Sequence, residues 1–109
     1  MKRYLVDSAA IRQNLETLKK RAGKARLFSV VKGNGYGLGL VPLAAICRDA
    51  GVDTFCVTEV SDAKQLRDAG FTQDILMIRP TCDVDEVHQL LDLSVILTVS
   101  SPDDAAVLN

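Results

Sequence analysis

The sequence is poor in the residues that build disulfide scaffolds and metal centres. Its 109 residues include three cysteines, Cys47, Cys56 and Cys82, and one histidine, His88. An odd number of cysteines without a Cys-x-x-Cys pair, and with no second imidazole, favours neither a disulfide framework nor a zinc cage. We therefore predict free thiols that behave as small apolar residues, no metal site, and a His88 side chain at the edge of a helix.

Charge of one sign and long apolar runs are also lacking. The chain has 13 Lys and Arg against 14 Asp and Glu, so it gives no sequence-wide signal for binding nucleic acid or an anionic membrane. No segment approaches the roughly 18 to 20 apolar residues of a membrane span, and the N-terminus reaches charged residues before any signal-like run forms. We expect a cytoplasmic globular protein without nucleic-acid or membrane partners.

The N-terminal part predicts a helix over residues 8–22. Asp7 or Ser8 can cap its start, three basic residues suit its C-terminal end, and Gly23 follows. Its apolar positions are spaced by four and three residues, as a helix requires. They are Ile11, Leu15 and Leu18.

Four short apolar runs then alternate with helical segments. The runs cover residues 26–32, 54–58, 74–78 and 94–99. The helical segments cover about 41–50, a stretch through Ala69, 83–92, and the chain from Ser101. The strand centres, Ser29, Cys56, Leu76 and Leu97, lie 27, 20 and 21 residues apart. This spacing predicts parallel strands joined by crossover helices.

Two architectures fit such serial βα units. One is an open doubly wound sheet, and the other is part of a (β/α)8 barrel. Periodicity does not choose between them. A closed barrel needs about 250 residues, so the length alone favours the open sheet.

The segment VVKGNGYGLG places Lys32 at the carboxyl end of a strand and follows it with glycines at every second position. The spacing matches neither the Rossmann fingerprint nor the P-loop. Alternating glycines suit a backbone that packs against a flat ligand or adopts dihedrals that a Cβ disfavours.

Lys32 has chemistry of its own in this position. Phe28, Val30 and Val31 precede it, and such apolar neighbours predict partial desolvation, which favours the neutral amine. A neutral amine forms Schiff bases with aldehydes, so Lys32 is a candidate carrier of pyridoxal phosphate. The alternative is a lysine that snorkels from a strand end beside a flexible turn.

The motif resembles the lysine motif of the alanine racemase family, which are fold type III enzymes dependent on pyridoxal 5'-phosphate (PLP). The similarity extends through VTEVSDA, DILMI and LTV and covers nearly the whole chain. It implies that residues 1–109 are a partial N-terminal domain, about half of a PLP-binding (β/α)8 TIM barrel. It also implies that the family's C-terminal β-domain is absent from this chain.

The resemblance also implies roles for three residues. Lys32 corresponds to the Schiff-base lysine, which is one of two catalytic bases; Tyr36 corresponds to a tyrosine that hydrogen-bonds the cofactor phosphate; and Ile78 corresponds to a position lining the cofactor pocket. Two departures occur: family members often have Ala at the positions of Gly33 and Gly35, and His at that of Leu38.

The implied activity is racemisation of an amino acid, most specifically L-alanine to D-alanine, by an isomerase that is a homodimer at full length. The family's second base and its substrate-selecting residues lie outside the matched segment, so we expect this chain alone to be inactive. Two other hypotheses remain open. One is a non-catalytic PLP carrier, and the other is a small non-enzymatic βα domain.

Overall fold

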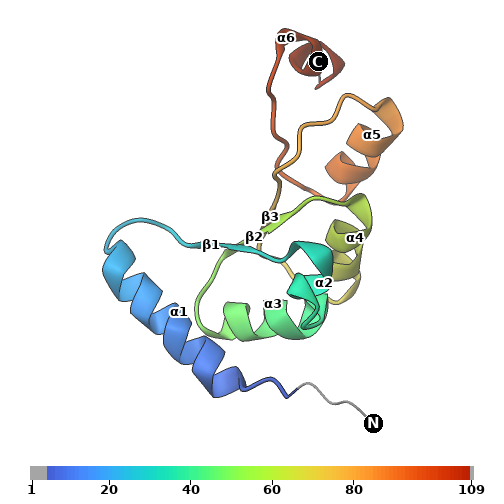
Figure 1. Ribbon diagram of the computed structural model, residues 1–109. Coiled ribbons are helices and arrows are strands. Elements are labelled where there is room, and N and C mark those ends of the chain that lie inside the picture. Colours follow the sequence, from blue (N-terminus) through green and yellow to red (C-terminus); the bar gives the residue numbers. More distant parts are fainter. Residues whose placement is uncertain (1–4, 109) are drawn as a thin grey trace.

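Three parallel strands and six helices make up the computed structural model, which describes residues 5–108 (Figure 1). In chain order they are α1 (Ser8–Ala22), β1 (Phe28–Val30), α2 (Lys32–Tyr36), α3 (Leu40–Asp49), β2 (Thr54–Val57), α4 (Val60–Asp68), β3 (Asp74–Met77), α5 (Val84–Asp92) and α6 (Pro102–Leu108). The elements lie where the periodicity predicts them, except for the fourth strand and for α2, which occupies the predicted glycine-rich turn and has left-handed dihedrals at Gly33, Asn34 and Gly35.

The strands form one parallel sheet in the order β1-β2-β3. The register aligns Phe28 with Thr54 and Thr54 with Asp74, so all three strands start at one edge and end at the other. A helix crosses between each strand and the next, as parallel pairing requires. The prediction of an α/β architecture with parallel strands is confirmed.

The predicted fourth strand at 94–99 is wrong as a strand, because one residue alone pairs with β3. Ile96 forms an isolated parallel bridge with Leu76. Two backbone hydrogen bonds flank this bridge, from Met77 N to Ile96 O at 2.9 Å and from Ile96 N to Ile75 O at 2.8 Å. The Thr98 hydroxyl donates to Met77 O at 2.6 Å. The Thr98 side chain thus occupies Met77 O, which would accept the next backbone hydrogen bond of a parallel ladder.

The hydrophobic core lies on one face of the sheet, beneath α3, α4 and α5. Alternate strand residues point to this face and are fully buried. They are Phe55, Val57, Ile75 and Met77. The helices contribute small and aliphatic side chains to the same cluster, which include Ala44, Ala63, Leu66 and Leu90. On the other face the outer strands are open, with Phe28 46% exposed and Val30 and Ile78 each 36% exposed, whereas Thr54 and Cys56 of the central strand are buried.

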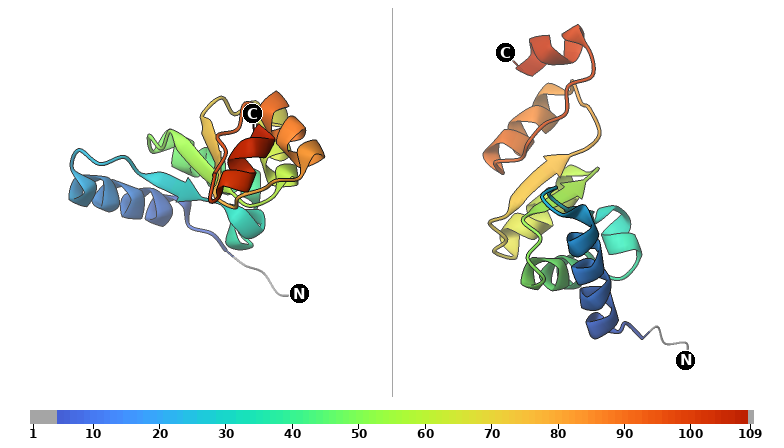
Figure 2. Two further views of the ribbon diagram at one scale, coloured as in Figure 1. Left: turned by 90° about the horizontal axis from the view of Figure 1, so that it is seen from above. Right: turned by 90° about the vertical axis from the view of Figure 1, so that its left-hand side faces the viewer.

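The molecule is a flattened plate. Its extents are 44 × 41 × 22 Å and its radius of gyration is 15.3 Å, against about 13 Å for a globular domain of this length. Figure 2 shows α1 and α6 at opposite ends of the molecule. A plate with helices on one face is the shape that a segment of a barrel wall has.

Helix α1 begins and ends as its capping residues predict. Asp7 is the N-cap, and its carboxylate accepts hydrogen bonds from the N–H groups of Ala9 and Ala10 at 3.0 and 3.2 Å. Gly23 follows the last turn with a φ of 61°. No residue of α1 is buried, although Leu15 packs against the core.

Within residues 5–108, no group of three or more His, Cys, Asp or Glu side chains could hold a metal ion. Cys47 and Cys56 are buried and Cys82 is exposed, and burial raises the pKa of the Cys56 thiol. His88 is exposed on α5, as predicted. Between residues 5 and 108, no helix is long and apolar enough to span a bilayer.

Candidate functional site

Two predicted site residues, Lys32 and Ile78, lie at the same edge of the sheet, after strands that flank β2. Lys32 follows the end of β1 after one residue, Val31, and Ile78 comes directly after the end of β3. The backbone of Val31 donates to Cys56 O at 3.0 Å, and that of Ile78 donates to Val57 O at 3.0 Å. Both side chains therefore start from the carboxyl edge, where parallel βα proteins bind their ligands.

The glycine-rich segment after Lys32 is a left-handed turn. Gly33, Asn34 and Gly35 have φ and ψ values of 63° and 44°, 54° and 45°, and 66° and 39°. Positive φ continues through Tyr36 at 55° and Gly37 at 86°. Hydrogen bonds from Gly35 N to Val31 O at 2.9 Å and from Gly37 N to Gly33 O at 3.0 Å close the turn. The alternating glycines thus serve dihedrals that a Cβ disfavours, as the sequence predicts.

The two sides of this turn differ. Gly35 is buried, and a Cβ there would lie 3.3 Å from the Leu43 side chain of α3. A Cβ at Gly33 or Gly37 would meet no atom within 4 Å. The inner side of the turn is packed on α3, and the outer side is open.

Tyr36 stands on the open side. Its side chain is 62% exposed, and with Val6, Gly37 and Leu38 it lines a cavity of about 460 Å³. Of these four residues, Tyr36 is the one with a polar side chain, and Leu38 adds an apolar one.

The predicted desolvation of Lys32 is wrong. Lys32 is exposed, because Phe28 and Val30 lie on the face of the sheet that no helix covers. Only Val31 among its three apolar predecessors is fully buried. Apolar sequence neighbours do not desolvate a side chain unless they fold over it.

Arg79 is a residue of this edge that sequence reasoning missed. Its Nε donates to Thr58 O, after β2, at 3.0 Å, and its guanidinium pairs with Glu86 of α5 at 3.0 Å. It therefore connects the ends of two strands with the next helix, directly beside Ile78. No sequence signal marks it, because the Thr58 carbonyl that it binds lies 21 residues earlier in the chain.

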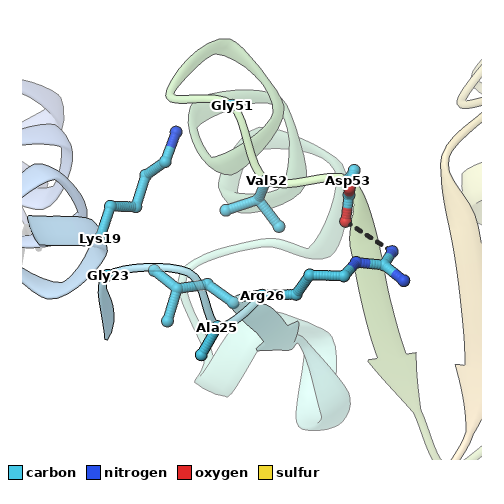
Figure 3. A pocket seen from close by; sticks show the side chains of 8 residues that line it. Lys19, Gly23, Ala25, Arg26, Gly51, Val52 and Asp53 are labelled. Atoms are coloured by element: carbon cyan, nitrogen blue, oxygen red, sulfur yellow. Dashed lines mark hydrogen bonds and ion pairs between the residues drawn. The ribbon is translucent and has the colours of Figure 1, made fainter. Parts of the chain in front are cut away.

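The opposite edge carries a structural ion pair. Arg26, before β1, donates to Asp53 at 2.9 Å and to the Thr54 hydroxyl at 2.8 Å. The Arg26 hydrogen bond holds the pKa of Asp53 below its usual value of 3.8. Figure 3 shows this pair beside a cavity of about 140 Å³ that Lys19 also lines. Groups at the amino ends of strands in such folds serve stability.

The parallel βα order, with a lysine at the carboxyl edge of the sheet, fits a segment of a (β/α) barrel. Residues 6–109 match the family described as "Alanine racemase, N-terminal domain". The chain belongs to the alanine racemase family, which depends on pyridoxal phosphate.

Relatives and solved structures agree with this assignment. The chain is 38% identical to the alanine racemase of Pediococcus pentosaceus, over 89% of this chain and 26% of that protein. It is 37% identical to that of Corynebacterium glutamicum, over 94% and 28%. The alanine racemase structure from E. faecalis superposes with a TM-score of 0.87 at 33% identity, over 95% of this chain and 28% of that one. This chain spans little more than a quarter of these relatives' length.

Proposed function

We propose that this chain forms the part of an alanine racemase that holds pyridoxal phosphate, with Lys32 as its Schiff-base lysine and one of two catalytic bases. The observation that carries the proposal is the position of Lys32, between the end of β1 and the left-handed turn. The relatives' names support conversion of L-alanine to D-alanine. Cytoplasmic location and homodimer formation remain predictions.

The groups along this edge fit the cofactor. Lys32 offers a primary amine for the aldehyde, and Tyr36 offers a hydroxyl that donates to a phosphate oxygen. The outer side of the turn is open at Gly33 and Gly37, which leaves room for a flat ring. Ile78, at 36% exposure, offers an apolar wall.

When bound, pyridoxal phosphate supplies an electron sink that acidifies the Cα proton of an amino acid. Lys32 Nζ would bind the aldehyde of the cofactor; as a free amine it would take the Cα proton of the substrate, and as an ammonium it would return one from the same side. Tyr36 Oη would donate a hydrogen bond to the phosphate. Racemisation needs a second base on the other side of Cα, so Lys32 accounts for one of the two proton transfers.

Reductive trapping tests the role of Lys32. The purified chain is mixed with pyridoxal phosphate, borohydride reduces the Schiff base to a stable secondary amine, and peptide mass spectrometry locates the label. We expect label on Lys32 at several times the level on Lys64, an exposed lysine paired with Asp68 on α4. Lys32→Met removes this label, and the matched control Lys64→Met leaves it unchanged. Equal labelling of all lysines would contradict the proposal.

A graft separates the racemase from a non-catalytic carrier. Residues 6–109 replace the matched segment of the Corynebacterium glutamicum relative, and formation of D-alanine is measured. We expect activity that Lys32→Met lowers at least about 1,000-fold, because both the cofactor attachment and one base are lost. A labelled but inactive graft favours the carrier. We also expect the 109-residue chain alone to be inactive, and turnover by it would refute that expectation.

A further inference from the structure

Tyr36 has a backbone conformation that its own residue type does not favour. Its φ of 55° lies in the left-handed region, which a non-glycine residue keeps only where its surroundings enforce it. Asn34, with a φ of 54°, tolerates this region better than other residues with a Cβ. The contacts that enforce the turn therefore decide where the Tyr36 phenol lies.

Asn34 connects the turn to the start of α3 by two hydrogen bonds. Gly39 N donates to its backbone oxygen at 2.9 Å, and Leu40 N donates to its Oδ1 at 3.0 Å. Leu40 is the first residue of α3 and is 2% exposed, and the N-cap Gly39 has no side chain to accept its N–H. Asn34 therefore supplies a capping acceptor from six residues upstream, for an N–H that the helix leaves unpaired.

Among the hydrogen bonds described for residues 33–40, the bond from Leu40 to Asn34 is the one that a side chain makes. The others join backbone groups and survive any substitution that keeps the chain's path. The bond to Asn34 Oδ1 is thus the side-chain hydrogen bond that joins the turn to α3, beside the packing of Gly35 on Leu43.

We propose that Asn34 is a positioning residue of the cofactor site, which fixes Tyr36 relative to Lys32 by anchoring the left-handed turn to α3. The inference rests on the proposed function, because it concerns the hydrogen bond from Tyr36 to the phosphate. Asn34→Gly keeps positive φ accessible and removes Oδ1. The Lys32 amine keeps its reactivity towards an aldehyde in this variant, while Tyr36 loses its fixed place.

Pyridoxal lacks the phosphate and also closes on its own aldehyde as a hemiacetal, which lowers its labelling of every lysine alike. The excess of the labelling ratio at Lys32 over that at Lys64 therefore measures the phosphate contact. We expect pyridoxal phosphate to label Lys32 several-fold more than pyridoxal does in the unmodified chain. Asn34→Gly and Tyr36→Phe should both lower this ratio to that of Lys64, without loss of pyridoxal labelling. Ser94→Gly is the matched control, because Ser94 has a φ of 56° far along the chain, and it should leave the ratio unchanged.

A measurement without cofactor tests the hydrogen bond from Leu40 N to Asn34 Oδ1 directly. Hydrogen exchange of the Leu40 amide should accelerate in Asn34→Gly and stay slow in Asn34→Asp, which keeps an acceptor at the same place. If Asn34→Gly does not fold, Asn34→Ser is the second variant, since its shorter side chain does not span the bond. An unchanged ratio or an unchanged Leu40 exchange overturns the inference alone. A wild-type chain without preference at Lys32 overturns the proposed function and this inference with it.

Discussion

Two alanine substitutions in the left-handed turn separate the cost of the backbone conformation from the cost of packing. Gly33 and Gly35 have nearly the same φ, 63° and 66°, so Ala at either position costs roughly 1 to 2 kcal/mol for a Cβ in the left-handed region. Gly33→Ala adds no contact, whereas a Cβ at Gly35 would lie 3.3 Å from two Leu43 carbons and 3.4 Å from Leu40 Cα. Such crowding adds about 1 kcal/mol, at the low end for overpacking.

Urea unfolding followed by far-ultraviolet circular dichroism measures this difference. With a slope of about 1 to 2 kcal/mol per molar urea for a small protein, Gly35→Ala should unfold about 0.5 to 1 M earlier than Gly33→Ala. Equal midpoints would refute the packing of Gly35 on Leu43. A Gly33→Ala variant as stable as the parent chain would refute the left-handed turn itself.

Two further predictions concern residues away from the site. Arg67 donates to three backbone carbonyls at 2.8 Å, so Arg67→Met should lower the free energy of unfolding in urea by at least about 2 kcal/mol. The control Lys64→Met removes an exposed ion pair and should lower it by under about 1 kcal/mol. Equal losses in the two variants would contradict this prediction. The hydrogen bond from Arg26 lowers the pKa of Asp53 in the folded chain, so its stabilisation is present above pH 3.8 and is lost as the pH falls further. In Asp53→Asn, the free energy of unfolding should fall less steeply as the pH drops below 3.8. The same pH dependence as in the parent chain would contradict the pairing of Arg26 with Asp53.

The sequence alone determined the parts of this protein that depend on local chemistry. Asp7 and Gly23 delimit α1 because a carboxylate caps helix N–H groups and glycine adopts positive φ. Alternating apolar runs and helices predicted parallel strands, and parallel strands place Lys32 and Ile78 at the same edge. The motif around Lys32 also sufficed to identify the family.

The tertiary structure decided what depends on contacts between distant segments. Lys32 is exposed although apolar residues precede it, because burial requires another element to cover the face on which they lie. The predicted fourth strand is only an isolated bridge at Ile96, because the Thr98 hydroxyl binds Met77 O, which the Thr98 backbone would bind in a strand. Arg79 binds a carbonyl 21 residues away. Periodicity predicts which face of an element a residue occupies, whereas the partners of Thr98 and Arg79 come into contact only when the chain folds.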